Sequence, residues 1–255
     1  MVLLDSVWKL RAGGEVLSVQ KQSISYRENS GILVMMYHVT SEYSPTNQDT
    51  IRRMKLAQST WENQLWKELP IHESTCRRMT DEVGSMPYIM DILNLATNDK
   101  KPSDIAVFTN SDICVSSLCS IQIAHALQGT SALYCYRRDF GRLDHPIQDD
   151  AIPEGHGYCG SDLYAFRVQW WKAYRDRFPD MLLGREAWDA ILRFIIDKSE
   201  IGNPVEIKNV AYHERHPSSW ESPDNRYRIK GQLHNLNLAR QWMQSNQLPP
   251  HMIGL

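Results

Sequence analysis

The chain has 255 residues, of which 42% are hydrophobic and 23% are charged, and its formal net charge is −2 at pH 7. This composition is ordinary for a folded soluble protein. The small net charge excludes a global basic field that would draw the protein to nucleic acid or to an anionic membrane.

Two further features of the composition concern the compartment. The five cysteines are odd in number and include no C-x-x-C pair, so neither a disulfide framework nor a cysteine-based zinc site is expected. The amino-terminal sequence MVLLDSVWKLRAGG lacks the basic start and apolar run of a signal peptide. No apolar stretch approaches the roughly 20 residues that a membrane span needs. We therefore expect free thiols and a cytoplasmic protein without a membrane span.

Strands and helices alternate along the first half of the chain. Residues 31–39, GILVMMYHV, form a continuous apolar run that predicts a strand buried on both faces. Residues 50–67 place apolar side chains at roughly helical spacing, and residues 86–98 predict a second helix with Pro87 in its first turn. Residues 104–115, DIAVFTNSDICV, predict the next strand.

The second half continues the alternation. It predicts a helix at 117–129, a strand at 131–140, a glycine-containing loop at 151–162, a short strand at 163–168, a helix at about 185–198, a late strand at 205–216 and a terminal helix at 230–246. Alternating strands and helices indicate an α/β fold with a largely parallel central sheet flanked by helices.

The strand at 104–115 is interrupted by the polar sequence TNSD, residues 109–112. In open α/β sheets, ligands bind at the carboxyl ends of strands, so Asp112 lies where a site is expected. A carboxylate in this position can cap a turn or pair with an arginine. It can also bind Mg²⁺ or Mn²⁺ together with a second protein ligand and a diphosphate.

The late sequence AYHERH offers His213 and His216 as that second ligand. Residues three apart on a strand face opposite sides, so we expect only one of the two to point into a site. The alternative is a pair of surface histidines. The sequence GREAWD contributes Glu186 and Asp189, which at a spacing of three can lie on one side of a helix. One of them can act as a general base, or both can simply interact with the helix dipole.

Arginine pairs supply candidate phosphate ligands. The pairs lie at 52–53, 77–78 and 137–138, and each can bind phosphate bidentately; Arg52 and Arg138 are assigned to the donor ligand. The glycine-rich sequence HGYCGSD, residues 156–162, matches no dinucleotide-binding motif. The chain also has no Walker motif and no nucleophile elbow, which argues against a P-loop kinase and an α/β-hydrolase.

The order of these motifs resembles the GT-A class of nucleotide-sugar glycosyltransferases. A buried strand and helix precede TNSD, and a glycine loop, the acids of GREAWD and a late histidine follow. The resemblance implies a GT-A-like (Rossmann-like) catalytic domain at 31–216, preceded by a lead-in at 1–30 and followed by a helical extension at 217–255. It also implies transfer of a sugar from a nucleotide-diphosphate sugar to an acceptor hydroxyl, assisted by Mn²⁺ or Mg²⁺.

The resemblance assigns roles to individual residues. Asp112 matches the last acid of the metal motif, while Asn110 stands where the first acid is usual and is assigned to the donor. His213 or His216 matches the late histidine that binds the metal. Glu186 or Asp189 matches the catalytic base.

The acceptor is left open. Asp162 after the glycine loop and Trp188 are assigned to acceptor binding, and a saccharide is the expected acceptor. A hydroxymethylated DNA base of a virus is an alternative, for which NRYRIK at 225–230 can form a local basic patch. A second alternative is a glycosyltransferase-like module without catalysis, which the departure at Asn110 favours.

Overall fold

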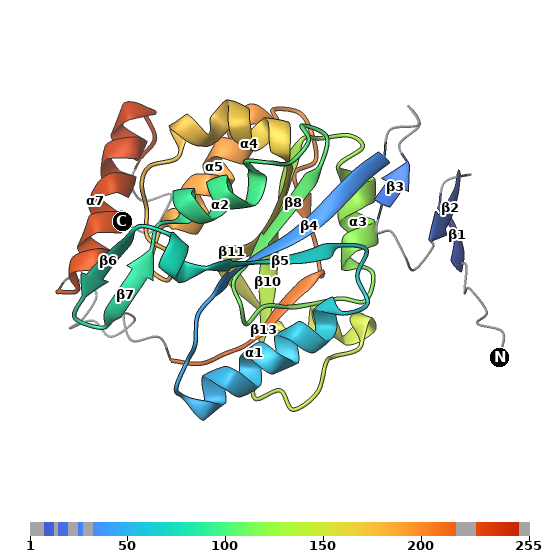
Figure 1. The fold of residues 1–255 in the computed structure, drawn as a ribbon, viewed down its shortest axis with the longest axis horizontal. Helices are drawn as coiled ribbons and strands as arrows, with labels where there is room; N and C mark the ends of the chain where they lie inside the picture. The colour runs from blue at the N-terminus through green and yellow to red at the C-terminus, as the bar shows by residue number, and fades with distance from the viewer. Residues whose placement is uncertain (1–7, 13–14, 20–24, 28–32, 218–227, 250–255) are drawn as a thin grey trace.

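Strand β8 (Ile105–Thr109) is buried at all five positions. The structure is a computed structural model that describes residues 8–12, 15–19, 25–27, 33–217 and 228–249. Within these residues β8 lies in a nine-stranded sheet with the order β3-β4-β8-β11-β10-β13-β9; β5 pairs with β4 and β12 pairs with β10 (Figure 1).

The bounds of the elements are as follows. The strands of the large sheet are β3 (Ser25–Arg27), β4 (Leu33–Glu42), β5 (Lys67–His72), β8, β9 (Cys114–Val115), β10 (Ala132–Phe140), β11 (His156–Arg167), β12 (Glu206–Ile207) and β13 (Ala211–Glu214). Two separate hairpins are β1 (Trp8–Ala12) with β2 (Glu15–Val19), and β6 (Arg78–Asp81) with β7 (Gly84–Pro87). The α-helices are α1 (Gln48–Trp61), α2 (Ile89–Thr97), α3 (Cys119–Ala126), α4 (Val168–Tyr174), α5 (Trp188–Ser199) and α7 (Lys230–Ser245).

The expectation of an α/β sheet flanked by helices is confirmed, but the expectation that the sheet is mostly parallel is wrong. Strand β4 is parallel to β8 and to β5, whereas β11 runs antiparallel between β8 and β10. The segment between β10 and β11 contains only a short 3₁₀ turn, Asp149–Glu154, and no crossover helix. Because a parallel connection is usually made by such a helix, the chain returns antiparallel and the sheet is mixed.

Several boundaries differ from the sequence-based expectation. Most of the predicted loop at 151–162 belongs to strand β11, which includes Gly157 and Gly160. Pro87 belongs to β7, and α2 begins two residues later at Ile89. Strand β5 and helix α4 were not predicted. Most of the predicted lead-in and part of the basic patch, residues 225–227, lie outside the described residues.

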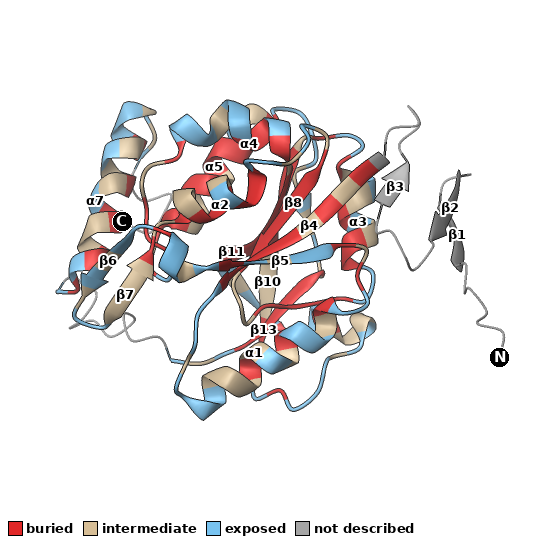
Figure 2. Ribbon diagram, viewed as in Figure 1, coloured by how far each residue is buried: buried red, intermediate tan, exposed pale blue. Residues whose placement is uncertain are grey.

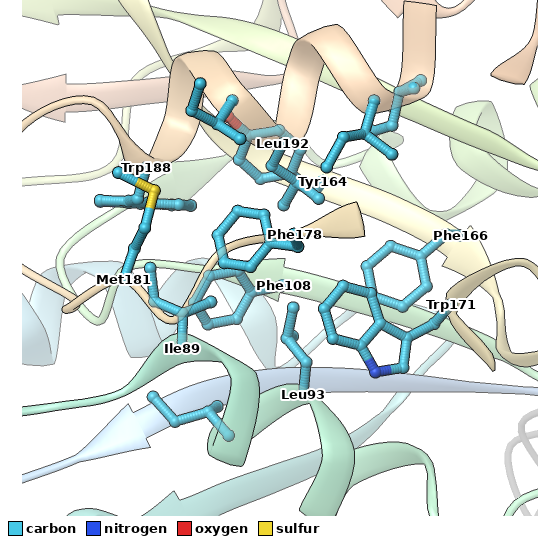
Figure 3. Close-up of a cluster of buried hydrophobic side chains, with 14 of the residues drawn as sticks. Ile89, Leu93, Phe108, Tyr164, Phe166, Trp171, Phe178, Met181, Trp188 and Leu192 are labelled. Carbon is cyan, nitrogen blue, oxygen red and sulfur yellow. The ribbon is translucent and has the colours of Figure 1, made fainter. Parts of the chain in front are cut away.

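Helices cover both faces of the sheet, and the core is divided accordingly. Ala106 and Phe108 of β8 belong to a cluster formed with α2, α4, α5 and α7, whereas Ile105 and Val107 belong to a second cluster with α1 and α3. This alternation is the period-two pattern of a strand covered on both faces. Figure 2 shows β8 coloured as buried. Figure 3 shows the aromatic centre of the first cluster.

The C-terminal helix α7 packs on the same core as the rest of the chain. Its buried residues Leu236, Ala239 and Met243 recur at helical spacing and belong to the first cluster. All five cysteines are free thiols, and four of them are buried. None of the helices within 33–217 and 228–249 combines the length and the apolar character needed to cross a lipid bilayer.

Candidate functional site

Strand register brings Asp112 and His213 together from segments 101 residues apart in the chain. Strand β13 pairs in parallel with β10, which places His213 beside Asp139. It also pairs antiparallel with β9, where Tyr212 lies opposite Cys114. Because the two strands run in opposite directions, the residues just before β9 lie beside the end of β13, and Asp112 meets the histidines there.

Both histidines contact the same carboxylate oxygen. Nε2 of His213 lies 3.4 Å from Oδ2 of Asp112, and Nε2 of His216 lies 3.2 Å from it. One ligand atom from each of the three residues lies within 4.8 Å of the others, and this is the single such group of three among the described residues. We call Asp112, His213 and His216 the metal group. The expectation that only one histidine faces the site is wrong, because β13 ends at Glu214 and strand alternation does not extend to His216.

The donor set of the metal group fits a divalent transition metal. It offers two imidazole nitrogens and one carboxylate, which together suit transition metals. Mg²⁺ prefers an all-oxygen shell, so the two histidines disfavour it. Of the two ions expected from the sequence, Mn²⁺ matches these residues better.

Hydrogen bonds fix the charges and the ring orientation within the metal group. Oδ1 of Asp139 lies 3.3 Å from Nδ1 of His213, on the side of the ring opposite Asp112. A carboxylate behind a histidine in this way holds the ring in a ligating orientation. Burial lowers the pKa of His213, but the hydrogen bonds to Asp112 and Asp139 outweigh it and raise the pKa to about 8. Burial raises the pKa of Asp112, but its two histidine partners hold it well below its usual value.

Behind the metal group lies a partly buried network of polar contacts. Arg137 donates from Nε to Asp139 at 2.8 Å and from Nη1 to Asp162 at 2.7 Å. Asp162 in turn accepts from Nδ2 of Asn110 at 2.7 Å. Asn110 is thus directed toward Asp162 rather than toward the metal group. Asp162, which the sequence analysis assigned to acceptor binding, is a buried member of this network of polar contacts.

From the sequence, the Arg137–Arg138 pair was a candidate phosphate ligand and only Arg138 was assigned to the donor, whereas Asp139 was not singled out. Residues two apart on a strand share a face, so Arg137 and Asp139 point together toward the site. Arg138 points the other way, and its Nη1 lies 3.5 Å from the carbonyl oxygen of Gly155. An arginine and an aspartate two apart in a predicted strand was the signal that could have identified this pair.

Asp189 has the properties of a general base. It lies in the first turn of α5, and its backbone oxygen accepts a hydrogen bond from Oη of Tyr164 at 2.8 Å. Burial, and then the negative charge of Asp162, raise the pKa of Asp189 to about 6. Gly160 permits this placement, because a Cβ there would lie 2.8 Å from Oδ2 of Asp189 and 2.5 Å from the ring of Tyr158. A pKa near neutrality is suited to proton transfer at physiological pH.

Glu186 does not share a helix face with Asp189, contrary to expectation. Helix α5 begins only at Trp188, and Ala187 before it adopts a left-handed conformation with φ 78°. This residue turns the chain, and the Glu186 carboxylate accepts a hydrogen bond from Nε2 of Gln232 in α7 at 2.6 Å. Of the two predicted bases, Asp189 is therefore the candidate.

Two further assignments lie away from the metal group. Arg52 pairs with Glu214, donates to the carbonyl oxygen of Leu143 at 2.6 Å, and lines a shallow pocket between α1 and Asp144. Trp188 is 5% exposed and packs with Phe108 and Tyr164 in the core (Figure 3). The assignment of Trp188 to acceptor binding is therefore wrong, because its ring is not available to stack on a sugar.

No protein-family model matches this chain, and a comparison with curated proteins gives no match.

Proposed function

We propose that the protein is a Mn²⁺-dependent glycosyltransferase that moves a sugar from a nucleotide-diphosphate sugar to an acceptor hydroxyl. The observation that carries the proposal is the convergence of Asp112 with His213 and His216 at one end of the sheet. The motif order of GT-A enzymes assigns the acid after the strand and a late histidine to the metal on the donor diphosphate. The mixed α/β sheet is compatible with such a fold.

The metal group and its neighbours bind and orient the donor. Asp112, His213 and His216 would hold the ion, which when bound supplies positive charge opposite the leaving diphosphate. Asp139 keeps Nδ1 of His213 hydrogen-bonded, so that Nε2 remains directed toward Asp112. Arg137 fixes Asp139 and Asp162 in turn, which makes this part of the site rigid before a ligand arrives.

Asp189 acts on the acceptor. With a pKa of about 6 its carboxylate is ionised at neutral pH and can accept a proton. In an inverting transfer, the acceptor oxygen forms a bond to the anomeric carbon as the bond from that carbon to the diphosphate breaks. The diphosphate leaves with the bonding electron pair, and the hydroxyl proton passes to Asp189. Proton transfer by a positioned base contributes about 10²- to 10⁴-fold to the rate.

A saccharide remains the acceptor class of the proposal. Binding of DNA requires arginines or lysines free to contact phosphates. Arg52 and Arg137 are instead held by the carboxylates of Glu214 and Asp139.

The test is transfer from a panel of nucleotide sugars to a mixture of saccharides, with Mn²⁺ or with EDTA, measured as released nucleoside diphosphate. We expect Mn²⁺-dependent release with one donor, reduced about a hundredfold or more in Asp112→Asn. Asp144→Asn, the same change at an exposed aspartate, should retain wild-type turnover. Turnover by Asp112→Asn at the wild-type rate, or equal turnover in EDTA, would contradict the proposal. Release of free sugar would identify hydrolysis instead.

A further inference from the structure

Arg53 is a buried cation with no carboxylate at ion-pair distance among the described residues, although the more distant Glu214 carboxylate shares its field. It is 8% exposed, its Nη2 donates to Oγ1 of Thr50 at 3.1 Å, and its Nε is buried with no hydrogen-bond partner. Arg185, the other buried arginine of the described residues, pairs with Asp81, and the partly buried Arg137 pairs with Asp139 and Asp162. A buried charge without a close counter-charge is costly, so the position of Arg53 favours the binding of an anion there.

Helix geometry directs Arg53 toward the segment that carries Asp112. The buried residues of α1 are Arg53, Ala57 and Trp61, which are four residues apart and therefore share one face. On this face Nε1 of Trp61 donates to the carbonyl oxygen of Ile113 at 3.0 Å. The inner face of α1 thus packs on the chain just after Asp112, and Arg53 lies on it two turns before Trp61.

Tyr43 connects Arg53 with the metal group. Tyr43 follows β4 and is partly exposed. Burial and then the negative charge of Asp112 raise the pKa of Tyr43, while a hydrogen bond with Ser111 and the positive charge of Arg53 oppose this rise. The charges of Arg53 and Asp112 therefore act on the same side chain.

We propose that Arg53 binds a phosphate of the ligand whose diphosphate is held by the metal group. A guanidinium matches a phosphate through two parallel hydrogen bonds, and Nε of Arg53 is without a partner to make one of them. The identity of the ligand that carries the phosphate depends on the proposed function, whereas the anion site at Arg53 does not. The assignment of a donor-binding arginine therefore moves from Arg52 to Arg53. Neighbouring helix residues are turned about 100° from each other, so only one of the pair faces inward.

The two arginines of the pair are predicted to respond in opposite ways. Arg53→Met removes an unmatched buried charge, so it should raise the melting temperature of the free protein and weaken anion binding. Arg52→Met leaves the buried Glu214 without its partner, so it should lower the melting temperature and leave anion binding unchanged.

The experiment is calorimetric titration with inorganic pyrophosphate, in EDTA and with Mn²⁺, together with melting curves. We expect wild-type protein to bind, Arg53→Met to bind about tenfold to a hundredfold more weakly, and Arg53→Lys to fall between them. Arg52→Met should bind as the wild type does. Equal affinity in wild type and Arg53→Met would overturn the inference, as would no binding by the wild type under either condition.

Competition by nucleotide sugars separates this inference from the proposed function. If pyrophosphate binding depends on Arg53 but no nucleotide sugar competes, the anion site stands and the glycosyltransferase proposal fails. If transfer occurs and Arg53→Met keeps the wild-type KM for the donor, the glycosyltransferase stands and the role of Arg53 fails.

Discussion

The Asp81–Arg185 pair and the candidate site are two charged clusters that differ in whether their charges are matched. The Asp81 and Arg185 side chains are 0% and 3% exposed, and Arg185 donates to both carboxylate oxygens. Asp81 also accepts from the backbone amides of Val83 and Gly84 at 3.0 and 3.1 Å. This pair joins the β6–β7 hairpin to the turn before α5, and its oxygens have partners within the fold.

The candidate site, in contrast, contains side chains whose charges are not paired one to one. Two histidines share one oxygen of Asp112, and Asp189 forms no ion pair within the described residues. Arg53 forms no ion pair with a carboxylate among those residues either. Paired charges therefore stabilise the fold at the hairpin, whereas charges without an ion-pair partner lie in the region where we propose that a ligand binds.

The largest predicted effect on stability is at the matched pair. Arg185→Met leaves Asp81 buried without its partner and should lower the free energy of unfolding by about 3–5 kcal/mol. Arg77→Met is the matched control, because the Arg77 side chain is 57% exposed although it pairs with Asp91 and Asp180. We expect the control to cost about 1 kcal/mol or less in urea denaturation. Equal losses in the two variants would remove the distinction between the clusters.

At the unmatched cluster, a substitution should harm activity and help stability. Asp189→Asn should lower kcat by about 10²- to 10⁴-fold, because the base is lost. The pKa of Asp189 is raised from 3.8 to about 6, so its contribution to stability is present below 3.8 and is lost as the pH rises through 6. At neutral pH the asparagine variant should therefore melt at a higher temperature than the wild type.

The control for this variant is Asp176→Asn, whose side chain is 93% exposed. It should change neither kcat nor the melting temperature. The stabilisation by Asp189→Asn should disappear when melting is measured below about pH 4, where the wild-type carboxyl is protonated in both states. A wild-type kcat in Asp189→Asn would contradict the assignment of the base.

The same pKa predicts the pH dependence of transfer. At saturating Mn²⁺, kcat/KM of the wild type should rise with pH through about 6 and then level off, because Asp189 must be ionised to accept a proton. Initial rates across the acidic and neutral range provide the measurement. A profile that is flat, or that falls, across this range would exclude Asp189 as the base.

A smaller effect is expected at Gly160. A Cβ there would lie 2.5 Å from the Tyr158 ring and 2.8 Å from Oδ2 of Asp189, so one of these side chains must shift. Gly160→Ala should therefore lower stability by about 1–3 kcal/mol and reduce kcat. Gly141→Ala meets no atom within 4 Å and should leave both unchanged. If the two variants behave alike, Gly160 does not position Asp189.

The metal group could be predicted from the sequence because its residues lie at or just beyond the ends of strands. TNSD ends β8, and His213 lies in β13, so their side chains meet at one end of the sheet. The number of histidines facing Asp112 could not be predicted, because it depends on β13 ending at Glu214 before His216. The motif order alone did not show where that strand ends.

Other parts of the site depended on backbone details that composition does not encode. The left-handed Ala187 separates Glu186 from Asp189, although their spacing suited one helix face. The choice between Arg52 and Arg53 depended on which side of α1 faces the sheet. The glycines around Gly160 predicted a loop, yet they lie in β11, where the small residue makes room for neighbouring side chains.

The metal group is tested most directly by titrating Mn²⁺ into the metal-free protein, with binding measured by calorimetry and by electron paramagnetic resonance. We expect one bound ion per chain with nitrogen couplings from imidazole, lost in Asp112→Asn and in His216→Ala while circular dichroism shows an intact fold. His72→Ala, at an exposed histidine paired with Glu42, should bind as the wild type does. Undiminished Mn²⁺ binding in Asp112→Asn and His216→Ala would contradict the account.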